Sequence, residues 1–160
     1  MIQAVPNGEE RPVTPRYRSK TLAAWIAVLG GTLGMHRWYV HGLRDAWAWL
    51  HWPLAALGLL GVQHMRVFGQ DDRLSWVLVP MLGLVISQAM FMAIVWALTP
   101  DERWDARHNP GLEPRSTGWG PVLAAVAALI VGGTVLIGTI AYAGQRYFEW
   151  QLEPVRTSTG

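Results

Sequence analysis

With 160 residues, of which 51% are hydrophobic and only 15% charged, the chain carries far less charge than the roughly 25% typical of soluble domains. A net charge of +2 without a basic stripe argues against nucleic-acid binding, and the absence of cysteine excludes disulfides and thiolate chemistry. The apolar residues lie in long blocks and are accompanied by ten tryptophans, which favour membrane–water boundaries. We therefore predict an all-α integral membrane protein, a bundle of four transmembrane helices.

The N-terminal half predicts a two-helix membrane hairpin over residues 18–65. Residues 1–17 are polar and predicted to form a disordered tail. The first apolar block is shorter than the about 20 residues that cross a bilayer. We therefore expect its helix to begin near Arg18 or Ser19 and to carry residues 36–39 at its far end. Asp45 is placed to cap the second helix, which contains Pro53.

Residues 66–150 predict a second pair of transmembrane helices. The block at 74–98 is the clearest span, because Trp76 and Trp96 lie about 30 Å apart along a helix and would place one indole at each membrane face. The fourth span is expected over residues 121–143. The polar residues 151–160 predict a disordered C-terminal tail.

The connection at 99–118 predicts a short helix that lies on the membrane surface. Its start, Thr-Pro-Asp-Glu, is typical of a capping box with Pro100 at the first helical position. Asn109-Pro110-Gly111 would end the helix about two turns later. We expect Trp104 to anchor it at the interface.

The distribution of lysine and arginine predicts the orientation of the bundle. Four flank the first span on its N-terminal side, two lie in the second loop and two in the C-terminal tail, which places eight on one side and five on the other. Cytoplasmic loops are enriched in these residues. We therefore expect a multi-pass protein of the bacterial inner membrane with both termini in the cytoplasm.

One local motif is distinctive. An Arg18-Ser19-Lys20 start, a helix rich in alanine and leucine, and then a Gly-x-x-Gly-x-His-Arg-aromatic-Tyr segment lead to Gly42. This pattern resembles the TM-two domain family of two-helix membrane hairpins, also described as NINE-type proteins, over about residues 18–62. The resemblance implies a membrane hairpin and no defined activity, since bacterial members mostly lack one.

The same segment holds the first candidate contact residues. Gly30 and Gly34 would form a Gly-x-x-x-Gly face that admits a neighbouring helix. The four residues after Met35 would sit at the membrane boundary, either as a structural turn or as a recognition site for a lipid headgroup or partner protein. These are His36, Arg37, Trp38 and Tyr39.

Few polar side chains fall inside the predicted spans. We expect His51 to hydrogen-bond to a neighbouring helix. His64 lies thirteen residues later on nearly the same helix face, which leaves a remote haem-linked redox alternative, although the third and fourth spans carry no partner histidines. Ser87 and Gln88 could bond across helices or line a narrow polar path.

Two further patterns allow a structural and a functional interpretation. Asp101, Asp105 and His108 fall on one face of the short helix, where they could hold a divalent metal, or the aspartates could pair with Arg103 and Arg107. We predict no metal site. The second pattern is a small-residue seam suited to helix packing, within the chain or between copies, and consists of Ala124, Ala128 and Gly132.

The chain shows no nucleophile–base pair, phosphate loop or intramembrane carboxylate pair, so we predict neither an enzyme nor a cofactor. The primary hypothesis is an accessory or assembly subunit that packs against a larger inner-membrane complex. Its partners would be the bilayer and other membrane subunits or itself, and not nucleic acid. The alternative is a self-associating pore or transporter.

Overall fold

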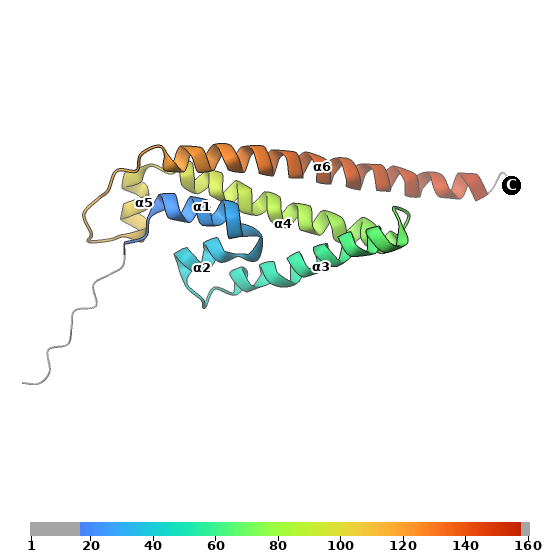
Figure 1. Ribbon diagram of the computed structural model, residues 1–160, viewed down its shortest axis with the longest axis horizontal. Helices are drawn as coiled ribbons and strands as arrows, with labels where there is room; N and C mark the ends of the chain where they lie inside the picture. Colours follow the sequence, from blue (N-terminus) through green and yellow to red (C-terminus); the bar gives the residue numbers. More distant parts are fainter. Residues whose placement is uncertain (1–16, 158–160) are drawn as a thin grey trace, which may run out of the picture.

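A computed structural model describes residues 17–157, with side chains described as far as residue 152. Nearly all of the predicted N-terminal tail, and residues 158–160, lie outside the described residues. Within that range all regular structure is helical, which confirms the predicted all-α class (Figure 1). The helices are α1 (Lys20–Gly30), η1 (Gly31–Leu33), α2 (Met35–His41), α3 (Ala46–Phe68), α4 (Arg73–Leu98), α5 (Asp101–His108) and α6 (Gly120–Thr157).

The first predicted span is not one helix. α1 ends after 11 residues, and α2 turns back alongside it after the short η1 (Figure 1). The reversal occurs at Gly34, whose φ of 74° lies in the left-handed region. A Cβ on Gly34 would lie 2.5 Å from the carbonyl oxygen of Ala48, so α3 packs directly against this turn. The prediction of one helix through residues 36–39 is wrong, and Gly30 and Gly34 do not share a helical face.

Three long helices form the body of the molecule, with α4 in contact with α1, α3 and α6. Asp45 caps α3 as predicted, accepting from the backbone N–H of Trp47 at 3.1 Å. Asp72 caps α4 in the same way, accepting from the backbone N–H of Ser75 at 2.9 Å. The helix α3 continues across Pro53 to Phe68.

Glycines set the close approach of these helices. A Cβ on Gly58 of α3 would lie 2.4 Å from the Cβ of Leu82 on α4. On the other side of α4, a Cβ on Gly83 would lie 1.8 Å from the Thr139 hydroxyl of α6. With no side chain at these positions the helices approach closely and gain van der Waals contact.

The short helix α5 differs from its prediction. It begins at Asp101 with no side-chain cap, because the Thr99 hydroxyl donates instead to the Val95 carbonyl at 2.7 Å. The predicted capping box is therefore wrong, whereas α5 does end at His108 as predicted. Trp104 is only 2% exposed, so it is a core residue rather than a surface anchor.

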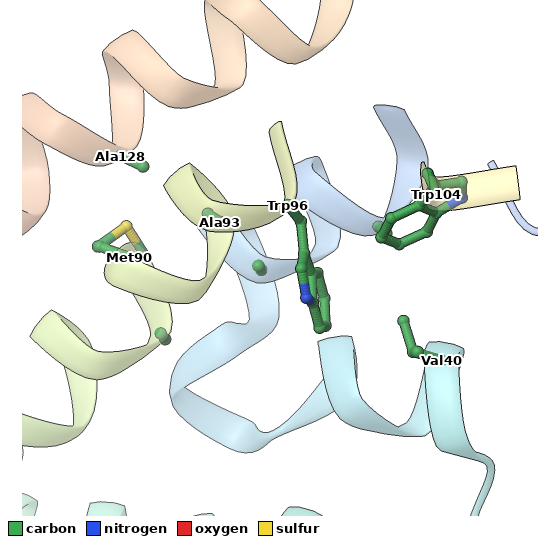
Figure 2. Close-up of a cluster of buried hydrophobic side chains, with 9 residues drawn as sticks. Val40, Met90, Ala93, Trp96, Trp104 and Ala128 are labelled. Carbon is green, nitrogen blue, oxygen red and sulfur yellow. The ribbon is translucent and has the colours of Figure 1, made fainter. Parts of the chain in front are cut away.

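The core cluster explains why Trp104 is buried. It packs against Trp96, with ring centroids 6.0 Å apart, and both indoles lie beside Val40 of α2 (Figure 2). Trp96 is 8% exposed, so its indole is covered by the protein's own side chains, and its predicted place at a membrane face stays a prediction. Tryptophan spacing alone cannot tell an interfacial ring from one covered by a later helix.

The last helix is longer than expected. α6 continues to Thr157, through much of the segment predicted to be a disordered tail. Its 38 residues correspond to about 57 Å, well beyond the thickness of a hydrocarbon core. Its C-terminal end therefore extends beyond the other helices (Figure 1).

By length and composition, two helices of the described chain could cross a membrane, α4 and α6. α1 is too short, and four spans are not established. α3 has 23 residues, but its early tryptophans and histidine make it less apolar. The chain enters the described region at the α5 end of the molecule, and α6 ends at the opposite end (Figure 1).

Candidate functional site

The end of the molecule formed by α1, α2 and α5 holds most of its buried polar groups. The Lys20 side chain is buried and forms an ion pair with Asp101, while its ammonium also donates to the Thr99 carbonyl at 2.9 Å. Thr117 donates to Asp101 from its backbone N–H at 2.8 Å and from its hydroxyl at 2.6 Å. Burial raises the pKa of Asp101, but the hydrogen bonds from Lys20 and Thr117 outweigh it and lower the pKa to about 2.

Asp105 is the buried carboxylate of this end, at 5% exposure, whereas Asp101 is partly exposed. It accepts from the Tyr17 hydroxyl at 2.9 Å, from the Asn109 amide at 2.7 Å and from the Arg115 backbone at 2.9 Å. Burial and the hydrogen bond to Asp105 raise the pKa of Tyr17 to about 12. The start of α1 is thereby joined to α5 and to the loop that follows it.

Arg18 completes this junction through its backbone. Its N–H donates to Asn109 at 2.7 Å, and its carbonyl accepts from the Trp104 indole at 2.8 Å. These contacts join residues more than 80 positions apart, so no local pattern in the sequence indicates them. The only available signal was an isolated lysine beside an apolar block and an acidic short helix later in the chain.

The contacts also decide between the two interpretations of the α5 aspartates. They do not pair with Arg103 or Arg107; they accept hydrogen bonds from α1, from Asn109 and from the loop at 115–117. His108 instead packs on Trp104, with ring centroids 4.1 Å apart. Within residues 17–152, no group of three or more His, Cys, Asp or Glu is arranged to hold a metal ion.

The distinctive motif after Met35 divides into separate structural roles. The Tyr39 hydroxyl accepts from the backbone N–H of Ser19 at 2.8 Å, which fastens α2 to the start of α1. Arg37 donates to Asp45 at 2.7 Å. Trp38 packs against the aromatic start of α3, with its ring 4.9 Å from Trp49.

His36 is fully buried between α3 and α4. Its ring lies 5.6 Å from that of His51 and 5.4 Å from that of Trp96, and neither ring nitrogen has a partner among the described residues. His51 reaches the Gln88 carboxamide on α4 at 3.0 Å, so it bonds to a neighbouring helix. Ser87 donates at 2.8 Å to the Gly83 carbonyl of its own helix and does not bridge helices.

The remaining predicted residues lie at helix contacts. Ala124 and Ala128 are fully buried where α6 packs against α1 and α4, and a Cβ on Gly132 would lie 2.6 Å from the Met90 Cβ. The seam is therefore occupied within the chain. His64 lies 3.6 Å from the Asp72 carboxylate, so the two histidines considered for haem have other neighbours.

A cavity of about 320 Å³ opens between α2, α4 and α5. Its apolar part includes Val40, Met92, Val95 and the two core indoles. Its polar lining has Thr99, three arginines and two histidines, with no carboxylate; the arginines and histidines are Arg37, His41, Arg103, Arg107 and His108. The arrangement can accept a group with a negative charge and an apolar portion.

A second cavity of about 440 Å³ lies between α4 and α6 at the opposite end. Its one cationic side chain, Arg146, is buried and already forms an ion pair with Glu149. The guanidinium also lies 5.3 Å from the Tyr142 ring centroid and 5.6 Å from that of Trp76. This cavity is mainly apolar, and the cationic α2–α4–α5 cavity is the stronger candidate site.

Comparisons with known proteins assign no family. No family model, no curated protein and no solved structure matches the chain. The resemblance of residues 18–62 to the TM-two domain family stays a prediction.

Proposed function

We propose that the chain is a non-catalytic integral membrane protein that acts as an accessory or assembly subunit of a larger membrane complex. The observation that carries the membrane assignment is its apolar exterior. Only a third of the most apolar stretch of α4, and 17% of that of α6, is buried in the fold. The core helix of a soluble protein would be mostly buried, and monomeric soluble proteins rarely expose such continuous apolar surface.

Individual side chains support this assignment along the length of the body. Phe91 of α4 is 63% exposed, Ile137 of α6 is 70% exposed and Leu59 of α3 is 55% exposed. In water, each would leave a large apolar side chain in solvent. In a bilayer, the same surfaces contact lipid or another subunit without that cost.

The structure supports a topology of three crossings and one re-entrant hairpin. In this arrangement α3, α4 and α6 cross the membrane, whereas α1 and α2 enter and leave on the same side. The turn at Gly34 then lies at membrane depth, where it is covered by Ala48 of α3. Irregular backbone is tolerated at that depth only when protein buries it.

This topology revises the predicted orientation. Among residues 17–152, seven lysines and arginines lie at the α5 end of the molecule and three lie at the opposite end. The positive-inside rule then places the α5 end in the cytoplasm, with the N-terminus inside and the C-terminus outside. The seven are Arg18, Lys20, Arg37, Arg44, Arg103, Arg107 and Arg115; the three are Arg66, Arg73 and Arg146.

The use of the polar groups supports the accessory role. Asp101 and Asp105 of the α5 end are engaged in contacts within the fold, and His51 bonds to Gln88. The small-residue seam of α6 is filled by the chain's own helices, which leaves the outer faces of α3 and α6 for larger apolar side chains. Such faces suit packing against further transmembrane helices.

The absence of cysteine makes the topology directly testable. Single cysteines replacing Ala4, Leu43, Glu113 and Asp71 are labelled in intact cells with a membrane-impermeant maleimide. We expect labelling at Asp71→Cys only, with the other three protected until the membrane is opened. Under a four-span topology Ala4→Cys would share the accessibility of Asp71→Cys, so that result would overturn the re-entrant hairpin.

The accessory role is tested by native mass spectrometry of the protein tagged at its own locus and released in mild detergent. A complex with other membrane subunits at fixed stoichiometry is the expected result. A closed homo-oligomer that conducts ions in liposomes would contradict it and favour a pore. Extraction of the chain from membranes by alkaline carbonate would contradict the membrane assignment itself.

A further inference from the structure

We propose that the α2–α4–α5 cavity binds the phosphate headgroup of an anionic phospholipid, with Arg103 and Arg107 as its principal contacts. The inference rests on the proposed membrane assignment and adds a specific ligand class to it. Three arginines and two histidines line this cavity, and none of its lining residues is acidic.

The two arginines of α5 are the principal contacts proposed for the phosphate. Arg103 and Arg107 are one helical turn apart, a spacing at which like charges destabilise a helix. Both are exposed and line the cavity, and neither forms an ion pair with another residue in the described range. The nearby aspartates Asp101 and Asp105 are already engaged by other donors. A bound phosphate would neutralise this pair and accept hydrogen bonds from both guanidinium groups.

The other polar groups of the cavity contribute less than the two α5 arginines. Arg37 is partly neutralised by Asp45, so it contributes less charge than the α5 pair. Burial lowers the pKa of His108, and the positive charges of Arg107 and Arg18 lower it further. The Nδ1 of His108 lies 3.2 Å from the Trp104 carbonyl, and the Thr99 hydroxyl donates to the Val95 carbonyl, so the hydrogen bonds to a phosphate come from the arginines.

The apolar part of the cavity favours a lipid over a free anion. Besides the arginines, the cavity is lined by the apolar side chains of Met92 and Val95, which belong to α4, a helix that could cross a membrane. Val95 and Leu98 are 40% and 66% exposed on this helix, and so offer a surface for acyl chains beside the cavity. A soluble phosphate would use the arginines and leave this apolar surface uncovered.

The test is a lipid titration followed by native mass spectrometry on the delipidated full chain in detergent. Phosphatidylglycerol and phosphatidylethanolamine with identical acyl chains are compared with glycerol 3-phosphate, which has the phosphate and no chains. We expect phosphatidylglycerol to bind in preference to both. In the variant Arg103→Gln/Arg107→Gln, the apparent Kd for phosphatidylglycerol should rise by about 25-fold, or about fivefold for each arginine.

The control variant Arg44→Gln/Arg66→Gln removes the same charge from exposed positions outside the cavity. It should bind phosphatidylglycerol like the original chain, and both variants should keep the same unfolding temperature. Equal weakening in both variants, or equal binding of the two lipids, would overturn the site. Equally tight binding of glycerol 3-phosphate would overturn the lipid assignment in favour of a soluble anion. The membrane proposal is checked separately by carbonate extraction, so either can fail alone.

Discussion

The two halves of this molecule are held together by different forces. At the α5 end, buried ions and hydrogen bonds join α1 to α5 and to the loop at 115–117. In the body, α3, α4 and α6 meet through glycine and alanine, with few polar contacts between them. The stability of the α5 end depends on the pairing of its buried charges. The stability of the body depends on small residues at the points where its helices touch. Substitutions should therefore act by different mechanisms in the two regions.

The largest effect is expected at the turn where the two regions meet. Gly34→Ala adds a Cβ at a positive φ and 2.5 Å from the Ala48 carbonyl oxygen, so strain and overlap act together. We expect the free energy of unfolding to fall by about 3 kcal/mol or more. Thermal unfolding in detergent, followed by tryptophan fluorescence, measures the change.

Gly111→Ala is the matched control for this turn. Gly111 also has a positive φ, of 78°, in the turn that the Leu112 N–H closes by donating to the Asn109 carbonyl, but nothing lies within 4 Å of a Cβ built there. It should cost only the backbone strain, about 1–2 kcal/mol. Equal losses in the two variants would mean that packing against α3 does not define the re-entrant turn.

A second substitution tests the ionic region. Asp101→Asn leaves the buried Lys20 ammonium without its counter-ion, which should cost about 3 kcal/mol. Glu102→Gln removes the same charge from the neighbouring exposed position and should change stability by less than about 0.5 kcal/mol. Unfolding midpoints of both variants at neutral pH provide the comparison.

Asp101 also predicts a dependence on pH. Its pKa is lowered to about 2 in the folded chain, from an ordinary value of 3.8, so folding favours the ionised form. The stabilisation is complete above about pH 4 and is lost as the pH falls towards 2. Asp101→Asn should flatten the stability profile in this window. An unchanged acid profile would show that Asp101 is not held by Lys20.

These regions also differ in what the sequence could predict. The cap at Asp45, the end of α5 before Asn109 and the extent of α4 depend on neighbouring residues, and the sequence predicted them. The turn at Gly34 depends on Ala48, and the pairing of Lys20 depends on Asp101, 81 positions away. Such contacts exist only once the helices have packed. The burial of Trp104 was missed for the same reason.

The third substitution concerns the packing of α4 on α6. Gly83→Ala places a Cβ 1.8 Å from the Thr139 hydroxyl, which must move for the helices to stay in contact. We expect a loss of about 1–2 kcal/mol. Gly133→Ala in α6 meets nothing within 4 Å and should be neutral or stabilising, because alanine favours a helix. Thermal unfolding measures both variants. Shifts of the same sign and size in the unfolding temperature would contradict the close packing of α4 on α6 at Gly83.

The smallest effect is expected at the polar pair inside the body. Gln88→Leu replaces the polar side chain with an apolar one of similar size. It removes the contact that His51 of α3 makes with the Gln88 carboxamide of α4 at 3.0 Å. Hydrogen bonds between membrane helices contribute about 0.6 kcal/mol on average, so the unfolding midpoint should fall only slightly. Ser87→Ala is the control, since that hydroxyl bonds within its own helix and should matter less. A loss above about 2 kcal/mol at Gln88 would mean that the body, like the α5 end, depends on a polar pair, and the contrast between the two regions would fail.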